Sequence, residues 1–170
     1  MVKINQNEGV LNVSSNGDGG KANGASQNQN YLNSIFNSGS GKVVINTDDV
    51  NGDGKSDYID ITWYNENDQE IKNITDVDGD GKLDYIRTKE YDENGKLTRV
   101  SVDNNGDGKL DNIRTKEYDE NGKLTKVSVD NNGDGKPDFI LSYEYDEKGT
   151  LRKMIEDSDG DENPDFVGVQ

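Results

Sequence analysis

The strongest constraint in this sequence is a 27-residue repeat that begins at Asp49 and continues without insertions to the end of the chain. Five aspartates mark the same point of successive units: Asp49, Asp76, Asp103, Asp130 and Asp157. A fixed period of this length means that one supersecondary unit is copied along the chain. Each unit contains an acidic Gly-rich segment, a β-prone stretch, a turn and a second β-prone stretch. The sequence therefore predicts an all-β protein of tandem antiparallel hairpins, stacked as a meander or a solenoid, with acidic loops between hairpins.

The turn within each unit sets the register of its hairpin. In the second unit, Asp92, Asn94 and Gly95 suit a type I turn closed by a left-handed glycine. That turn predicts three cross-strand pairs: Tyr91 with Leu97, Thr88 with Val100, and Ile86 with Val102. A two-residue Asn-Gly turn would instead pair Glu90 with Arg99, and Glu117 with Lys126. We favour the first register because it gathers apolar side chains on one face.

The composition cannot support an ordinary core. Only 28% of the 170 residues are hydrophobic, and 35 acidic against 19 basic residues give a net charge of −16. Such a chain is disordered unless something other than apolar burial stabilises it. The acidic balance argues against nucleic acid as a partner, and the short apolar runs argue against membrane insertion. The first residues also lack the apolar stretch of a secretory signal.

The absence of cysteine and histidine excludes several kinds of catalytic and metal site. The chain has no Cys and no His, so it can form no disulfide, no Ser-His or Cys-His catalytic arrangement and no typical zinc site. Paired carboxylates are abundant, but all of these pairs belong to the acidic segments or to turns, whereas an acid-base enzyme needs two acids of contrasting environment in a cleft. We therefore expect a protein that is not an enzyme.

The acidic segments have the pattern of a cation-binding loop. Asp-x-(Asp/Asn)-Gly-Asp-x-x-x-Asp occurs at residues 49–57, 76–84, 103–111, 130–138 and 157–165. Carboxylates at alternate positions converge when the chain curls, and glycine at position six permits the sharp bend. Hard oxygen ligands in this number suit Ca²⁺. A helical EF-hand is excluded because its twelfth position, normally Glu, holds other residues here: Asp60, Arg87, Arg114, Leu141 and Gly168.

These nine-residue loops resemble the calcium loops of thrombospondin type 3 repeats and of FG-GAP and VCBS repeats, which an Asp at position nine closes. The resemblance does not cover the whole repeat, because thrombospondin repeats carry Cys and FG-GAP blades are longer. The Tyr-Asp-Glu-Asn-Gly-Lys-Leu segments also look like the tyrosine-aspartate repeats of bacterial surface and toxin shells.

The resemblance implies five Ca²⁺ sites, with side-chain oxygens from positions one, three, five and nine and a carbonyl oxygen from position seven. The implied ligands are Asp49, Asn51, Asp53, Lys55 and Asp57; Asp76, Asp78, Asp80, Lys82 and Asp84; Asp103, Asn105, Asp107, Lys109 and Asp111; Asp130, Asn132, Asp134, Lys136 and Asp138; and Asp157, Asp159, Asp161, Asn163 and Asp165. The fifth loop departs from the pattern because Glu162 replaces the glycine of position six. That loop must either hold a strained left-handed residue or open differently.

Two aromatic features have structural interpretations. The tyrosines of the turn ends, Tyr64, Tyr91, Tyr118 and Tyr145, could form a sugar-binding ladder, but we favour cross-strand packing with Leu97, Leu124 and Leu151. Trp63, the one tryptophan, is expected to pack the first repeat against the N-terminal segment.

The composition divides the chain into an N-terminal segment, residues 1–47, and five repeats, residues 48–170, the last of them truncated. Residues 14–41 are rich in Gly, Ser, Asn and Gln, and strand-like patches near Val10 and at Val43 to Ile45 flank them. Such patches could add to the sheet of a neighbouring copy and form a homopolymer.

We expect a calcium-stabilised structural repeat protein: a surface stalk, an adhesin segment or a self-assembling filament subunit. Cytosolic calcium is too scarce to fill weak loops, so we expect an extracellular or cell-surface location, in a bacterium. The alternative is a calcium-dependent binding module for a glycan or a protein receptor.

Overall fold

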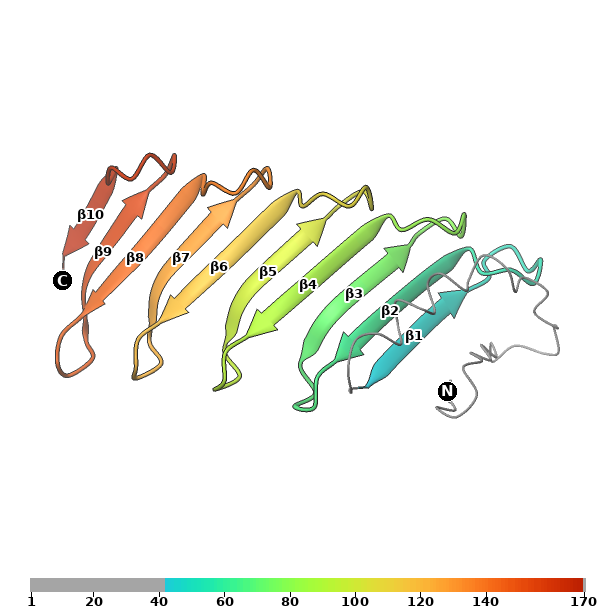
Figure 1. Cartoon of the computed structure of the whole chain (residues 1–170), viewed down its shortest axis with the longest axis horizontal. Coiled ribbons are helices and arrows are strands. Elements are labelled where there is room, and N and C mark those ends of the chain that lie inside the picture. The colour runs from blue at the N-terminus through green and yellow to red at the C-terminus, as the bar shows by residue number, and fades with distance from the viewer. Residues whose placement is uncertain (1–41, 170) are drawn as a thin grey trace. The chain divides into compact units, whose positions relative to one another are not determined.

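The computed structural model describes residues 42–169, which form ten β-strands and, within that range, no helix. The strands are β1 (Val43–Asp48), β2 (Tyr58–Tyr64), β3 (Glu70–Asp76), β4 (Tyr85–Tyr91), β5 (Leu97–Asp103), β6 (Asn112–Tyr118), β7 (Leu124–Asp130), β8 (Phe139–Tyr145), β9 (Leu151–Asp157) and β10 (Phe166–Val169). They form one open antiparallel sheet in sequence order, from β1 to β10 (Figure 1). The predicted all-β meander is confirmed, as is the strand at Val43, whereas the predicted strand near Val10 and linker 14–41 lie outside the described residues.

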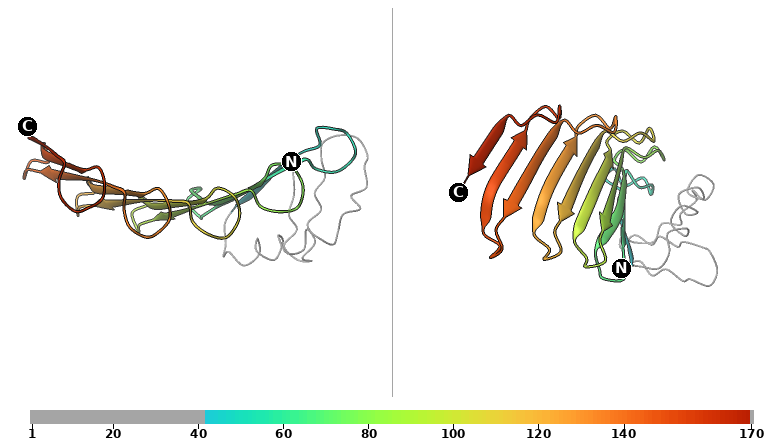
Figure 2. Two further views of the ribbon diagram at one scale, coloured as in Figure 1. Left: turned by 90° about the horizontal axis from the view of Figure 1, so that it is seen from above. Right: turned by 60° about the vertical axis from the view of Figure 1, so that its left-hand side comes forward.

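The described part of the chain divides into two compact units between Ile86 and Arg87, within β4. Within each unit the acidic loops lie at one end of the strands, and the hairpin turns lie at the opposite end (Figure 1). We call the end with the hairpin turns the turn edge. In the second unit the strands lie in a single layer (Figure 2).

The hairpin turns have the predicted geometry. The Gly95 N–H donates to the Asp92 carbonyl at 3.0 Å, and the Asp92 N–H donates to the Lys96 carbonyl at 2.9 Å. Gly95 has a φ of +78°, which is the left-handed conformation that closes a type I turn. The Asp92 carboxylate accepts the backbone N–H groups of Asn94 and Lys96. This side chain therefore organises the turn. In the next two hairpins Asp119 accepts the Lys123 N–H, and Asp146 accepts the N–H groups of Lys148 and Thr150.

The favoured register is correct only beside the turn. In the third hairpin Tyr118 pairs with Leu124 as predicted, but a bulge between Glu117 and Tyr118 then shifts the pairing by one residue. Beyond the bulge Glu117 pairs with Lys126, and Arg114 pairs with Val129. The charge pairs of the rejected register therefore form, with nitrogen–oxygen distances of 3.9 Å for Lys126–Glu117 and 3.8 Å for Arg99–Glu90. A bulge accommodates both signals because it inserts one extra residue in one strand.

Apolar burial is sparse, as the composition predicts. In the first unit a small cluster of Ile61, Trp63 and Ile74 is buried, with Val43 and Ile45 packed against it. In the second unit Val127 is the one hydrophobic side chain that is buried among the described residues. Val43 and Ile45 belong to the N-terminal segment, and Val43 pairs with Trp63 across the strands, so the predicted packing of Trp63 against that segment is confirmed for its described part, residues 42–47.

Two tyrosines at the turn ends, Tyr118 and Tyr145, make contacts both within their own hairpin and with the preceding hairpin. Tyr118 and Tyr145 pair across the strands with Leu124 and Leu151, so the predicted cross-strand pairing is confirmed for these two. The Tyr118 hydroxyl donates to the Leu97 carbonyl of the preceding hairpin at 3.0 Å, and the Tyr145 hydroxyl donates to the Leu124 carbonyl at 2.9 Å. These bonds connect successive hairpins at the turn edge.

Candidate metal sites

Each acidic loop is closed at its base by one backbone hydrogen bond. The N–H of the residue at position nine donates to the carbonyl of the residue that precedes position one. In the second loop Asp84 N–H donates to the Thr75 carbonyl at 2.9 Å, and the other four loops make the same bond at 2.7 to 2.9 Å. The bond joins the end of one strand to the start of the next, so the loop leaves and re-enters the sheet at a fixed separation.

The carboxylate at position one then organises the bend. Asp76 accepts the N–H of Gly79 at 2.7 Å with one oxygen and the N–H of Gly81 at 2.9 Å with the other. Both glycines have positive φ, +69° and +87°. From the other end of the loop, Asp84 accepts the Val77 N–H at 2.7 Å. The chain therefore curls around its own carboxylates, as the loop pattern predicts.

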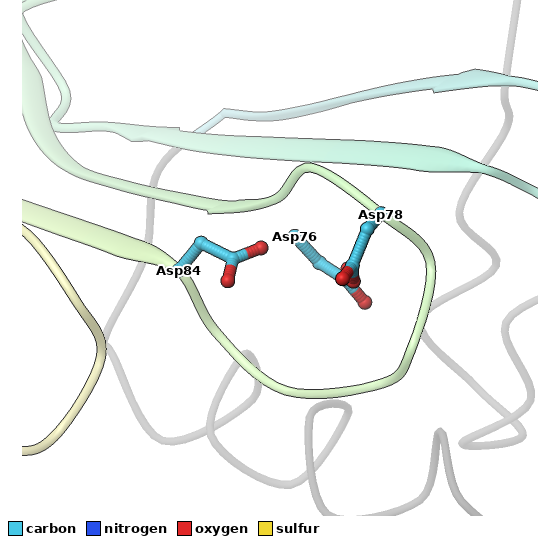
Figure 3. A group of neighbouring side chains, drawn as sticks. All are labelled: Asp76, Asp78 and Asp84. Carbon is cyan, nitrogen blue, oxygen red and sulfur yellow. The ribbon is translucent and has the colours of Figure 1, made fainter.

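In the second loop this curl brings three acidic side chains together. Asp76, Asp78 and Asp84 each offer an oxygen, and these oxygens lie within 4.8 Å of one another. Figure 3 shows the carboxyl groups of Asp76 and Asp78 together, with that of Asp84 turned toward them across the mouth of the loop. Asp76 is buried and 3% exposed, whereas Asp78 is exposed. Three carboxylates this close repel one another unless a cation lies between them, so the cluster could hold a metal ion.

The fifth loop forms a second cluster of the same kind, from Asp157, Asp159 and Asp165. Its departure from the pattern does not open the loop. Glu162, in the place of the sixth-position glycine, has a φ of +70° and donates its N–H to Asp157 at 2.9 Å, as Gly81 does to Asp76. The loop therefore keeps its shape at the cost of a left-handed non-glycine residue.

The remaining three loops have the same backbone bonds but do not bring three acids together, because position three is an asparagine: Asn51, Asn105 or Asn132. Each of these side-chain oxygens accepts the N–H of the position-five aspartate, at 2.8 to 3.0 Å. In the first loop the Asn51 amide nitrogen also donates to Asp57 at 3.0 Å. These loops supply two carboxylates and an amide where the other two supply three carboxylates.

The position-five aspartates lie outside both clusters of three. Asp80 forms an ion pair with Lys82, with Nζ 2.8 Å from the carboxylate oxygen, and also accepts the Lys82 N–H. The side-chain hydrogen bond from Lys82 lowers the pKa of Asp80. In the fifth loop Asp161 accepts hydrogen bonds from the side chain and backbone of Asn163, which lower its pKa. The predicted ligand roles of position five, and of the position-seven carbonyls, stay predictions.

Burial and hydrogen bonding act in opposite directions on the position-one carboxylates. Asp103 is 2% exposed and Asp130 is 6% exposed. Burial raises the pKa of each carboxyl, but four backbone N–H donors around each one outweigh this and hold the pKa below its ordinary value. Both groups are therefore ionised and positioned by the backbone.

One relationship among the loops was not predicted from the sequence. A side chain on Gly133 would collide with the Leu110 carbonyl of the preceding loop, and one on Gly160 would collide with the Pro137 carbonyl. A side chain on Gly79 would likewise collide with the Ser56 carbonyl, whereas a Cβ on Gly52, in the first loop, would have no atom within 4 Å. The glycine at position four therefore allows the second, fourth and fifth loops to stack on the loops that precede them. The signal in the sequence was this glycine, which the pattern contains in every loop.

No protein-family model matches the chain, and none of the curated proteins matches it either. None of the elements in the described range is a helix that could cross a membrane.

Proposed function

We propose that this chain is a calcium-stabilised structural repeat protein that acts outside the cell, as a stalk, an adhesin segment or a filament subunit. The observation that carries the proposal is the convergence of Asp76, Asp78 and Asp84, whose oxygens lie within 4.8 Å of one another. The net charge of −16 and the sparse apolar burial supply the reason why a cation is needed.

Calcium is the cation that fits this chemistry best. All the available ligands are carboxylate, amide and carbonyl oxygens, and Ca²⁺ accepts many such ligands in flexible geometry. Mg²⁺ retains its waters and demands an octahedral site. We propose five Ca²⁺ sites, with the second and fifth loops the strongest because each presents three convergent carboxylates. Weak sites of this type fill at extracellular calcium concentrations, which favours a location outside the cell.

The test is isothermal titration with Ca²⁺, together with circular dichroism and thermal melting with and without EDTA. We expect several bound ions, and loss of β-structure or a marked fall in melting temperature after chelation. Asp76→Asn should remove about one ion, because its carboxylate organises the loop. Glu120→Gln is the matched control: it removes the same charge from an exposed turn position and should leave the stoichiometry unchanged. A secondary structure and melting temperature that are indifferent to EDTA would contradict the proposal.

The proposal does not include catalysis, because the clustered acidic side chains organise the loops and turns. Self-association by strand addition belongs to the proposal as its filament form. Electron microscopy of the purified protein with Ca²⁺ tests it, since fibres are expected of a filament subunit and single particles of a stalk or an adhesin segment.

The second candidate function is a calcium-dependent binding module for a glycan or a protein receptor. The observation that favours it is a hollow lined partly by tyrosine between two hairpin turns of the second unit. Binding of defined glycans in the presence of Ca²⁺ tests this function.

A further inference from the structure

A hollow of about 620 Å³ lies at the turn edge of the second unit, between the β6–β7 turn and the β8–β9 turn. Tyr143 and Tyr145 of β8, with Thr125 of β7, line it, and Asn121 and Glu147 lie in the two turns that flank it. Its volume is within the range of small-molecule sites in proteins. Both turns can be followed along the lower edge of the strands in Figure 1.

Part of the lining is already occupied by contacts within the protein. The Asp146 carboxylate accepts hydrogen bonds from the backbone N–H groups of Lys148 and Thr150. It also accepts hydrogen bonds from Nε and Nη2 of Arg152. The Lys123 ammonium lies 5.1 Å from the centre of the Tyr145 ring and donates to the Gly149 carbonyl. Asp146 and Lys123 therefore have little capacity left to bind a ligand.

Other lining groups have no such partner in the part of the chain that the structure describes. The side chains of Tyr143, Asn121 and Glu147 make no hydrogen bond or ion pair there. Together they offer a phenol, an amide and a carboxylate, so both donors and acceptors remain available around the hollow.

Tyr143 is also not required by the repeat. The same position of the two preceding units holds Lys116 and Lys89, so a lysine is compatible with this strand position. Tyr145, by contrast, belongs to the tyrosine series that connects the hairpins. An aromatic ring at position 143, half-buried beside unpartnered polar groups, is therefore a local departure from the repeat.

We propose that this hollow binds a saccharide, with the Tyr143 ring as the platform for one face of a sugar. A sugar ring presents C–H groups on its face, which pack on an aromatic ring, and hydroxyls on its rim, which suit the amide and carboxylate. An apolar ligand would leave these polar groups unpaired. A phosphate is disfavoured because the lining holds three carboxylates, of Asp119, Asp146 and Glu147, against two ammonium groups, of Lys123 and Lys148. This inference gives the second candidate function a specific site.

The test is heteronuclear NMR of the full chain in Ca²⁺, titrated with four disaccharides: cellobiose, maltose, lactose and chitobiose. We expect at least one of them, at millimolar concentration, to shift the amide signals of Tyr143, Asn121 and Thr125. Tyr143→Lys should weaken this binding about tenfold or more, because the stacking contact is lost. Tyr143→Phe keeps the ring and should retain most of the affinity.

Tyr143→Lys reproduces the residue found in two other repeats, so it should leave the melting temperature and the Ca²⁺ stoichiometry unchanged. Those two measurements separate failure of this site from failure of the calcium proposal. Equal affinity of Tyr143→Lys and the unaltered chain would overturn the inference. Shifts confined to the acidic loops, or none with all four sugars, would overturn it as well; in the first case the second candidate function would survive with a different site.

Discussion

The ammonium group of Lys96 lies over the ring of Tyr118, with Nζ 5.0 Å from the ring centre, and donates a hydrogen bond to the Gly122 carbonyl in the next hairpin turn. Lys123 makes the same two contacts with Tyr145 and Gly149, one repeat further along. These two lysines therefore connect their hairpin turns to the following hairpin, at the end of the strands that has no acidic loop.

The hydrogen bond from Tyr118 to Leu97 should contribute measurably to this connection. Tyr118→Phe keeps the ring beneath Lys96 but removes the donor, and we expect a loss of about 1 kcal/mol in the free energy of unfolding. Urea denaturation in Ca²⁺ measures the loss. Tyr85→Phe is the control, because the Tyr85 hydroxyl makes no hydrogen bond within the described residues, and its effect should be near zero. Equal effects of the two substitutions would contradict the prediction.

Stacking of the loops should appear in a matched pair of glycine substitutions in the fourth loop. Gly133 and Gly135 both have positive φ, +69° and +88°, but only Gly133 lies against the Leu110 carbonyl. Gly135→Ala should cost about 1–2 kcal/mol from the left-handed backbone alone. Gly133→Ala should cost about twice as much, because the added methyl group collides with the preceding loop.

Chemical denaturation of both variants in saturating Ca²⁺ makes this comparison. The result that contradicts stacking is a Gly133→Ala protein as stable as the Gly135→Ala protein, since the loop would then move away at no cost.

Relief of strain in the fifth loop should stabilise the protein. Glu162 has a φ of +70°, which a glycine adopts without a Cβ clash, so Glu162→Gly should gain about 0.5–1 kcal/mol. Glu162→Ala removes the same carboxylate but keeps the Cβ, and it should give no such gain. Melting temperatures of the two variants check the prediction, and a gain shared by both would indicate a charge effect instead.

Asp146 should make the stability depend on pH in the acid range. The Thr150 N–H lowers the pKa of this carboxyl, burial opposes that effect, and the Arg152 guanidinium lowers the pKa further. Because the folded pKa is below the unfolded value of about 3.9, the stabilisation is present above that pH and is lost as the pH falls through the folded pKa.

Asp146→Asn should therefore lower the melting temperature at neutral pH, and the difference from the unaltered chain should shrink below about pH 4. Thermal melts across this range measure it. A difference that stays constant down to the acid limit would assign the effect to packing and not to ionisation.

The sequence was sufficient for features that depend on local chemistry repeated at a fixed period. The 27-residue spacing predicted the hairpins, Gly95 predicted the turn type, and the alternating aspartates predicted the curled loops. The register was predicted only near the turn, because the apolar pattern and the Glu117–Lys126 charge pair favoured different registers and a bulge satisfies both. The stacking of loops involves the carbonyl of Leu110 on Gly133, and a backbone contact between repeats has no side-chain signature beyond the glycine itself.

Sparse burial in the sheet has a thermodynamic consequence. Among the described residues only Ile61, Trp63, Ile74 and Val127 are buried hydrophobic side chains. Unfolding would therefore hydrate little new apolar surface, and the heat capacity change should fall below the usual value of about 12–15 cal/mol/K per residue. A small heat capacity change flattens the curve of free energy against temperature, so the protein would lose little stability on cooling.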